Sequence, residues 1–372
     1  MKNKFNIEMS GPLISKIDIR IVNDALKNGW YGDKKYYYVE KFEREFAEYH
    51  GRKYGLMTPN CTLATHLLLT ALGIKKGDSV INQDSTWVAP AAAVSYTGAK
   101  NIFCDNNLEN WCLDHNSLQE KITNSTKAVI TTALYGNMPD MDKIEKICRK
   151  NKLILIEDAA EGLGSKYKGR KVGSYGKASL FSFHRTKTLT TGEGGMMITS
   201  DKKLYERCKF LRDQGRDPFF TYQISELGFK YMPFNLQAAL GYSQFLQVDK
   251  IVMQKRKIYH WYKKFFHNYD VKLNTDNEDV YNGCWATTLI IGDKYKINAK
   301  LLMNYLKSKD LPVRPFFCPL SKMKPFRQNN NNINAAYLYK NGMTLPSALN
   351  LKKKEVQFYS ECIKNFLDNH NK

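Results

Sequence analysis

The sequence contains no apolar run that approaches the roughly 20 residues of a membrane-spanning helix. Its N-terminal run, residues 1–6, carries charge without an apolar core behind it, so it does not resemble a secretory signal. The eight cysteines form no Cys-x-x-Cys pair, and no cluster of cysteines and histidines has the spacing of metal ligands. We therefore expect a cytoplasmic protein that contacts no membrane, binds no metal and keeps its thiols reduced and mostly buried.

Acidic residues are scarce relative to basic ones, since 36 Asp and Glu stand against 57 Lys and Arg, a net charge of +21. Such an excess is typical of proteins that bind anions, and nucleic acid is the first class to consider. The basic residues are spread along the chain instead of forming one dense block, which disfavours nucleic acid as a partner. A lysine-rich coding bias would give the same excess, and a basic surface also suits a substrate that carries a diphosphate.

Internal repeats are absent too, and 372 residues suffice for one large domain and one smaller domain. Between residues 53 and 200, short apolar runs alternate with helical patterns, which predicts an α/β fold with a mostly parallel sheet covered by helices on both faces. The expected strands are 54–57, 79–82, 101–105, 128–134, 153–157, 178–183 and 195–199. The expected helices are 62–72, 87–96, 141–149 and 204–211.

A long helical stretch extends from residue 235 to about residue 267, and we place a domain boundary inside it, near residue 250. Residues 1–250 are expected to form a three-layer α/β/α large domain, whose N-terminal segment can pack on the small domain. The pattern of residues 251–372 predicts a small α+β domain with a strand at 285–291, helices at 299–307 and 354–367 and a turn at 310–312. We expect the asparagine-rich run 329–334 to be an exposed loop, because asparagine runs do not build a core.

One lysine and one acid stand where buried strands end. Lys187 follows the strand 178–183 and precedes a glycine-rich turn at 192–195, and Asp158 closes the strand 153–157. This pair suits an enzyme that holds a pyridoxal cofactor, with Lys187 forming the Schiff base and Asp158 pairing with the pyridinium nitrogen. Taken alone, Lys187 can also be an ordinary solvated lysine, and Asp158 can also be an acid that caps the next helix.

The turn at residues 59–62, between a strand and a helix, suits a phosphate group. The first free N–H groups of a helix point beyond its end, and the helix dipole favours an anion there. Thr62 and Leu63 can supply backbone donors, and Ser182, at a neighbouring strand end, can supply a hydroxyl. The alternatives are a plain N-cap for Thr62 and an ordinary pleat position for Ser182.

Two further residues can contact the ring of such a cofactor. Glu161 lies one helical turn after Asp158 and can meet the phenolic oxygen. Trp87 follows another strand-to-helix turn and can stack on the ring, although a position in the apolar core explains this tryptophan equally well.

Together these motifs resemble the DegT/DnrJ/StrS family of nucleotide-sugar aminotransferases, which has the aspartate aminotransferase fold (fold type I). The resemblance covers nearly the whole chain. It is carried by Gly-Trp at 29–30, Val-Glu-Lys-Phe-Glu at 39–43, Asn-Cys-Thr at 60–62, Leu-Tyr-Gly at 134–136, Glu-Asp-Ala-Ala-Glu at 157–161, the run from Ser-Phe-His at 182–184 to Gly195, and Gln-Ala-Ala at 237–239.

The resemblance implies pyridoxal 5'-phosphate as the cofactor, with pyridoxamine 5'-phosphate as its intermediate form. It also implies a homodimer whose active sites lie at the subunit interface. The residue roles that it implies are Lys187 as the Schiff-base lysine, Asp158 on the pyridine nitrogen, Glu161 on the phenolic oxygen, Trp87 against the ring, and Thr62, Leu63 and Ser182 on the phosphate. In many members a partner-subunit asparagine reaches the phosphate, and Lys230 stands at that position here.

Several positions depart from the family pattern. Ala133 stands where many members have histidine, Met232 where many have arginine, and Cys61 where glycine is usual. Related dehydratases replace the Schiff-base lysine by histidine. This chain retains Lys187, which favours amino transfer.

The subclass that the motifs resemble is that of the sugar 4-aminotransferases, and in particular the perosamine and viosamine synthases. Glu161 and the Arg-Pro-Phe-Phe run that begins at Arg314 carry this part of the resemblance. It implies transfer of an amino group from L-glutamate to C4 of a nucleotide-linked 4-keto-6-deoxyhexose, giving a 4-amino-4,6-dideoxyhexose for glycan biosynthesis. Arg314 is then a candidate for the donor carboxylate or the sugar diphosphate, and His184 for the sugar pocket.

Two alternatives remain open at this point. The first is a nucleotide-sugar 3-aminotransferase. The second is a non-catalytic dimer of the same fold that acts as a scaffold or as a DNA-binding regulator.

Overall fold

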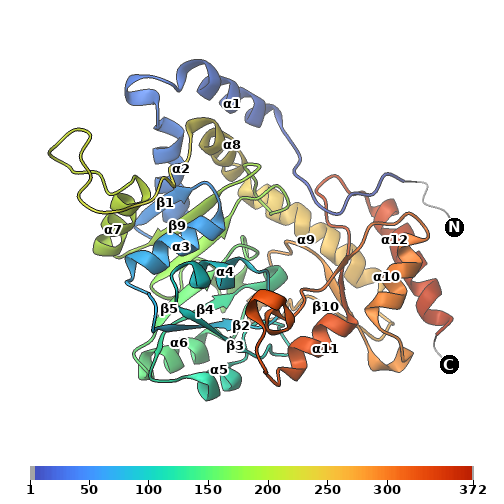
Figure 1. Cartoon of the computed structure of the whole chain (residues 1–372). Helices are drawn as coiled ribbons and strands as arrows, with labels where there is room; N and C mark the ends of the chain where they lie inside the picture. Colours follow the sequence, from blue (N-terminus) through green and yellow to red (C-terminus); the bar gives the residue numbers. More distant parts are fainter. Residues whose placement is uncertain (1–4, 371–372) are drawn as a thin grey trace.

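The computed structural model describes residues 5–370, so residues 1–4, on which the expectation of no signal segment partly rests, and residues 371–372 lie outside it. The central sheet of this described part has seven strands in the order β1-β9-β8-β5-β4-β2-β3 (Figure 1). These strands are β1 Tyr54–Thr58, β2 Ser79–Gln83, β3 Lys100–Cys104, β4 Thr126–Thr132, β5 Ile154–Asp158, β8 Ala178–Ser182 and β9 Gly195–Thr199. All neighbours pair in parallel except β9, which is antiparallel to both β1 and β8. The expectation of a mostly parallel sheet is confirmed.

Helices cover both faces of this sheet, because its strands carry apolar side chains on both faces and these side chains must be shielded from water. Along β1, Leu56 belongs to one buried cluster and Met57 to the other, as the two-residue period of a strand requires. One face is covered by α3 Cys61–Ala71, α4 Ala89–Tyr96 and α7 Lys202–Arg212. The opposite face is covered by α1 Lys16–Asn28, α2 Tyr37–Tyr49, α5 His115–Lys121, α6 Met141–Lys150 and α8 Asn235–Phe245. The chain therefore has the expected three layers.

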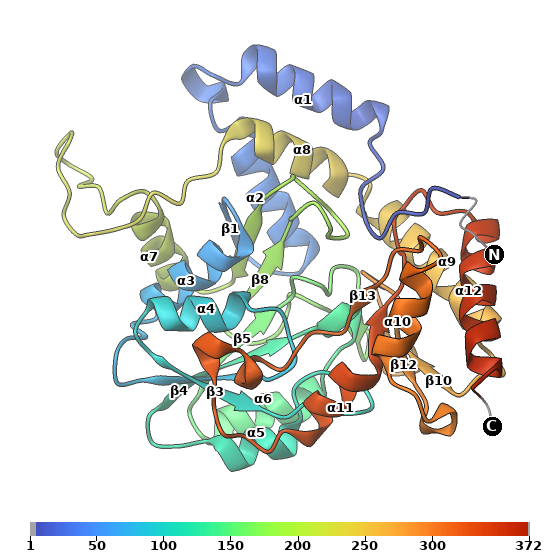
Figure 2. The ribbon, with the colours of Figure 1, turned by 45° about the vertical axis from the view of Figure 1, so that its right-hand side comes forward.

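The C-terminal part builds a second sheet and a separate apolar cluster. Its strands have the order β10-β12-β14-β13, with bounds β10 Val271–Leu273, β12 Thr288–Ile291, β14 Gly342–Thr344 and β13 Arg314–Pro315. The helices α9 Val248–Phe265, α10 Ala299–Lys307 and α12 Lys353–Asp368 pack around it (Figure 2). Ile7 of the N-terminal segment is buried in the same cluster. Apart from short 3-10 turns, the described residues also form α11 Ile333–Asn341 and a small sheet of β6 Lys166–Tyr167, β7 Arg170–Lys171 and β11 Val280–Tyr281.

The helical stretch expected at 235–267 is two helices, α8 and α9, separated at Leu246–Gln247. The proposed boundary near residue 250 falls at the start of α9. Val252 in the first half of α9 packs with the core of the large domain, whereas Ile258 further along packs with the C-terminal cluster. Helix α9 thus joins the two parts, and the division at residue 250 stays a prediction. No helix within residues 5–370 combines the length and the apolar character needed to cross a bilayer.

The prediction that residues 329–334 form an exposed loop is wrong for Asn332, which is buried, and for residues 333–334, which begin helix α11. The Asn332 side chain is buried and donates hydrogen bonds to Asp84 at 2.8 Å and to the Phe103 carbonyl at 3.2 Å. Asp84 is itself fully buried, and a buried carboxylate requires hydrogen-bond donors. A run of asparagines can therefore pack against the protein when it meets buried acceptors, and this one holds the segment before α11 against the large sheet.

Candidate active site

A cavity of about 770 Å³ opens where the carboxyl ends of β4, β5 and β8 meet the N-terminus of α3. This is the edge of an open α/β sheet at which ligands ordinarily bind. Nine of the ten residues predicted from the sequence line it: Thr62, Leu63, Trp87, Asp158, Glu161, Ser182, His184, Lys187 and Arg314. The tenth residue, Lys230, does not.

Lys187 projects from a loop that connects β8 to β9. The loop is closed by backbone hydrogen bonds from Phe183 to Gly194 and from Thr191 to Phe183, each 2.8 Å long. The Lys187 amine lies 3.1 Å from Glu161 Oε1, and its side chain is only 12% exposed. A lysine held in this way in a cavity, beside one carboxylate, is placed to act as a nucleophile and as a carrier of protons.

Asp158 ends β5 with its carboxylate in the cavity wall. Oδ1 accepts a hydrogen bond from the Ala160 N–H at 3.1 Å, and Oδ2 accepts one from the Thr132 hydroxyl at 3.3 Å. Burial raises the pKa of this carboxyl to about 6, although the two hydrogen bonds and the Lys187 charge act against the shift. Within the described residues, Asp158 has no cationic side chain as an ion-pair partner. A positively charged group of a bound ligand would stabilise the ionised form of this buried carboxylate.

Glu161 connects Lys187 to the backbone of the neighbouring loop. Its Oε1 accepts from the Lys187 amine, and its Oε2 accepts from the Tyr135 N–H at 2.9 Å. The Glu161 side chain is 3% exposed, so both oxygens face protein donors and the cavity instead of bulk water. The second carboxylate of the site is therefore held at a fixed distance from the lysine.

The expected phosphate end of the site lies at the N-terminus of α3. Asn60 caps this helix, and its side-chain oxygen accepts from the Leu63 N–H at 2.9 Å, so the donor expected of Leu63 is engaged by the cap. Thr62, in the same turn, lines the cavity. Ser182 Oγ, which lies across from it at the end of β8, accepts from the His184 N–H at 3.3 Å. Phosphate binding at this turn remains a proposal.

The other predicted side chains lie around the mouth of the cavity. Trp87 is 58% exposed, so it does not belong to the apolar core, and its ring lies 6.0 Å from that of Phe317. His184 contacts Thr186 at 2.9 Å and Glu193 at 3.5 Å, and partial burial lowers the pKa of its imidazole. Arg314 is exposed on β13 and contributes positive charge to the same rim.

The structure adds residues that no single motif indicated. Trp285 lines the cavity with its ring centroid 4.0 Å from the Lys187 amine, and its indole N–H donates to the Thr186 carbonyl at 2.8 Å. Tyr135 stacks on Trp285 at a centroid distance of 5.8 Å. Only the Leu-Tyr-Gly motif at 134–136 could have drawn attention to Tyr135. No sequence motif marks Trp285, because its place in the cavity depends on how the C-terminal part of the chain packs against the large domain.

The departures from the family pattern are accommodated without strain. Cys61 is the first residue of α3, and this right-handed helical position accepts a side chain as readily as glycine. Ala133 is buried beside the cavity. Lys230 is exposed and forms an ion pair with Asp213 at 3.1 Å, so it is absent from the site of its own chain, and a contribution to a partner subunit's site remains a proposal.

The residues present fit pyridoxal phosphate on the chemistry of the donor set. Asp158 is a buried acceptor that lacks a cation, which the ring nitrogen would supply. Lys187 is a shielded amine for the aldehyde carbon, and the N-terminus of α3 offers donors to a phosphate. A three-layer α/β chain with this arrangement has the features of a pyridoxal-phosphate-dependent transferase.

Sequence comparison identifies the family. Residues 12–364 match the DegT/DnrJ/EryC1/StrS aminotransferase family, and the chain belongs to it. The chain is 36% identical over 356 residues to the GDP-perosamine synthase of Escherichia coli O157:H7. The aligned region covers 95% of this chain and 97% of that protein. It is 31% identical over 361 residues to the GDP-perosamine synthase of Vibrio cholerae, covering 96% and 98%. The protein is a pyridoxal-phosphate-dependent sugar aminotransferase.

Solved structures agree with this fold. The Streptococcus pneumoniae protein Spr1654 in its PLP form superposes with a TM-score of 0.90 at 23% identity, covering 98% of this chain and 99% of that one. Helicobacter pylori PseC, an aminotransferase involved in the biosynthesis of pseudoaminic acid, superposes with a TM-score of 0.89 at 23% identity, again covering 98% and 99%. The predicted α/β fold of the pyridoxal-phosphate-dependent transferases is thereby confirmed.

Proposed function

We propose that this enzyme transfers the amino group of L-glutamate to C4 of a nucleotide-linked 4-keto-6-deoxyhexose and releases a 4-amino-4,6-dideoxyhexose of the perosamine type. The observation that carries the proposal is the similarity to two GDP-perosamine synthases over at least 95% of this chain. GDP is accordingly the first nucleotide to test. The product would serve glycan biosynthesis, as the 4-amino sugar of a polysaccharide.

Lys187 is the proposed proton carrier of both half-reactions. When bound, pyridoxal phosphate supplies the electron sink that accepts the electron pair of a broken Cα–H bond. The Lys187 amine takes the proton from Cα of glutamate, and in the second half-reaction it delivers a proton to C4 of the sugar. Glu161, 3.1 Å away, holds the amine in the position from which it reaches these carbon atoms.

The other polar residues of the cavity are proposed to bind the cofactor ring and the two substrates. Asp158 is proposed to keep the ring nitrogen protonated, since each partner of such a pair stabilises the charged form of the other. Arg314 and His184, at the mouth of the cavity, are proposed to bind the donor carboxylate or the sugar diphosphate and the sugar itself. The arginine fork matches both anions, so one residue can serve the two substrates in turn.

We also propose that the active enzyme is a homodimer. The loop before α8 exposes several large apolar side chains that a monomer would leave in water: Phe219, Phe220, Tyr222, Ile224 and Leu227. Lys230 follows this loop directly, pairs with Asp213 and does not line the cavity of its own chain. A second copy that covers the loop would bring Lys230 towards the phosphate end of the neighbouring site.

The test is a reconstituted reaction with pyridoxal phosphate, L-glutamate and 4-keto-6-deoxyhexoses linked to GDP, dTDP or UDP. We expect stoichiometric 2-oxoglutarate and, with the GDP sugar, a product whose NMR spectrum places nitrogen on C4. Nitrogen on C3 would favour the 3-aminotransferase instead. Failure with every 4-keto sugar, despite conversion of glutamate to 2-oxoglutarate, would overturn the proposed substrate and leave the amino-donor half-reaction standing.

A further inference from the structure

Tyr135 has a strained backbone at the centre of the site. Its φ is 54° and its ψ 23°, a left-handed conformation that is unfavourable for a bulky residue. In this conformation its N–H points at Glu161 Oε2, 2.9 Å away, and Glu161 in turn contacts the Lys187 amine. The strain is therefore coupled to the position of the catalytic lysine, and some other group must hold the Tyr135 peptide in place.

That group is the side-chain amide of Asn274, which comes from the C-terminal part of the chain. Asn274 is 2% exposed, and its Nδ2 donates to the Tyr135 carbonyl at 2.9 Å and to the Ala286 carbonyl at 3.1 Å. Its Oδ1 accepts from the Thr288 N–H at 2.7 Å. One amide thus satisfies three backbone groups, two of which belong to the loops that carry Tyr135 and Trp285.

These two loops enclose the lysine. Trp285, which immediately precedes Ala286, stacks on Tyr135 with an interplanar angle of 8° and lies against the Lys187 amine. By donating to both loops, Asn274 sets the distance between the two rings. It also fixes the peptide that follows Tyr135, and the strained φ and ψ of Tyr135 join that peptide to the one whose N–H holds Glu161.

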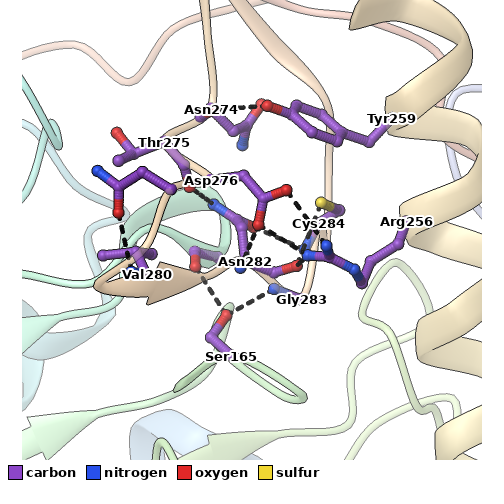
Figure 3. Close-up of polar contacts among 12 residues, drawn as sticks. Ser165, Arg256, Tyr259, Asn274, Thr275, Asp276, Val280, Asn282, Gly283 and Cys284 are labelled. Atoms are coloured by element: carbon purple, nitrogen blue, oxygen red, sulfur yellow. Dashed lines mark hydrogen bonds and ion pairs between the residues drawn. The ribbon is translucent and has the colours of Figure 1, made fainter. Parts of the chain in front are cut away.

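Helix α9 anchors the segment that contains Asn274 (Figure 3). The Tyr259 hydroxyl donates to the Asn274 carbonyl at 2.8 Å, and Arg256 forms an ion pair with Asp276 at 2.9 Å. The Asn282 N–H donates to the same carboxylate at 3.1 Å. The segment is thus fixed on the side away from the cavity, so the Asn274 amide is presented to Tyr135 from a rigid support.

We propose that Asn274 is a positioning residue for the Lys187 centre. By bonding the Tyr135 carbonyl it maintains the strained backbone of Tyr135, whose N–H on the preceding peptide orients Glu161, and it holds the Trp285 loop against the lysine. The inference rests on the proposed role of Lys187 and not on the identity of the sugar. Asn274 contacts neither Lys187 nor the cavity directly, and it acts through Tyr135 and Ala286.

The test compares Asn274→Leu and Asn274→Asp with the wild type as apoproteins. Both substitutions preserve side-chain size and remove the two N–H donors. Apoprotein is mixed with pyridoxal phosphate, reduced with borohydride at timed intervals and digested, and the adduct on Lys187 is quantified by mass spectrometry. We expect trapping to slow by about 10- to 100-fold, because displacement of a reacting group by about 1 Å has effects of that order. In the complete reaction, kcat should fall while KM for the sugar nucleotide changes less than about twofold.

Tyr359→Phe is the control, because it removes a buried hydrogen bond of the C-terminal cluster, from the Tyr359 hydroxyl to the Pro312 carbonyl, without touching the segment that contains Asn274. It should lower the melting temperature and leave the trapping rate at the wild-type value. Trapping at the wild-type rate in both Asn274 variants would overturn the proposal, as would equal slowing in Tyr359→Phe. If Asn274→Leu fails to fold, Asn274→Asp decides, since it retains an acceptor for the Thr288 N–H. A wild-type protein that traps the cofactor normally but converts no 4-keto sugar would refute the proposed function and leave this inference intact.

Discussion

Lys187 and Glu161 form an ion pair of 3.1 Å in which both side chains are largely shielded from water. We expect Glu161→Ala to reduce kcat by about 100-fold, because the lysine and the Tyr135 N–H both lose their acceptor. Glu161→Gln retains one acceptor oxygen and should cost only about 10-fold. Stopped-flow absorbance of the glutamate half-reaction measures both variants. Equal rates for Glu161→Ala and the wild type would show that the pair has no part in catalysis.

Replacement of Lys187 itself should abolish turnover. Lys187→Ala removes the amine that is proposed both to hold the cofactor and to move the proton, so no detectable product and no borohydride-stable adduct are expected. Lys168→Ala is the control, because Lys168 is an exposed lysine that pairs with Asp142 on the surface. Normal turnover in Lys187→Ala would refute the mechanism, whatever the behaviour of the control.

Asp158 should make the stability of the apoprotein depend on pH. Burial raises the pKa of its carboxyl from 3.8 to about 6, so the folded chain binds more protons than the unfolded chain between these values. The resulting stabilisation is complete below pH 3.8 and is lost as the pH rises through about 6. Apoprotein with Asp158→Asn should therefore be more stable than the wild type at pH 8, and this advantage should shrink towards pH 4.

Urea unfolding of both apoproteins at several pH values measures the difference in unfolding free energy between them. A second experiment measures the melting temperature of each protein when it is saturated with pyridoxal phosphate. A pyridinium partner for Asp158 predicts that the cofactor raises the melting temperature of the wild type more than that of Asp158→Asn. An equal rise in the two proteins would mean that the carboxylate does not meet the ring nitrogen. A constant stability difference across the pH range would contradict the raised pKa.

The positions of Lys187 and Asp158 could be predicted because both follow directly from local pattern. Asp158 ends one apolar strand, Lys187 lies in the loop that follows the neighbouring strand β8, and parallel strands present their carboxyl ends at one edge of the sheet. The order of such runs along the chain is therefore enough to bring these two residues to the same cavity. The same argument explains why the central strands were predicted to within a few residues of their observed bounds.

Tyr135, Trp285 and Asn274 could not be predicted in this way. The left-handed backbone of Tyr135 is maintained by the side-chain amide of Asn274, which lies 139 positions away in the sequence. Neither a tyrosine nor an asparagine at these positions indicates such a contact. The break between α8 and α9 at Leu246–Gln247 likewise contains neither proline nor glycine, so no local signal marks it. Burial of Asn332 depends on the fully buried Asp84, which lies in a distant part of the chain. Such features depend on tertiary contacts and not on local propensity.

Disruption of the apolar loop before α8 should dissociate the proposed dimer. Phe219 and Leu227 are almost fully exposed in the single chain, so the double substitution Phe219→Glu/Leu227→Glu would place charge in the interface without affecting the fold of the subunit. We expect a monomer by sedimentation velocity and a loss of turnover. Leu301→Glu, which alters an exposed leucine on α10, should leave both properties unchanged. A double variant that remains a dimer would place the interface elsewhere.

The last prediction concerns Lys255, a buried lysine on α9 that is 2% exposed and donates to the carbonyls of Trp285 at 3.1 Å and Ser347 at 2.7 Å. Burial lowers the pKa of its amine from 10.5 to about 8. Between these values the unfolded chain binds more protons than the folded one, so Lys255 destabilises the fold below pH 8, and this penalty disappears as the pH rises towards 10.5.

Comparison with Lys255→Met isolates this contribution. Cys284, the titratable group that acts on Lys255, is present in both proteins, and burial raises its pKa above the usual range for a thiol. The unfolding free energy of the wild type minus that of Lys255→Met should therefore increase between pH 8 and pH 10. Lys264→Met, which removes an exposed lysine from the same helix, is measured beside it as the control for the substitution itself. A flat difference for Lys255→Met would mean that its amine keeps the ordinary pKa despite burial, because water or an anion reaches it.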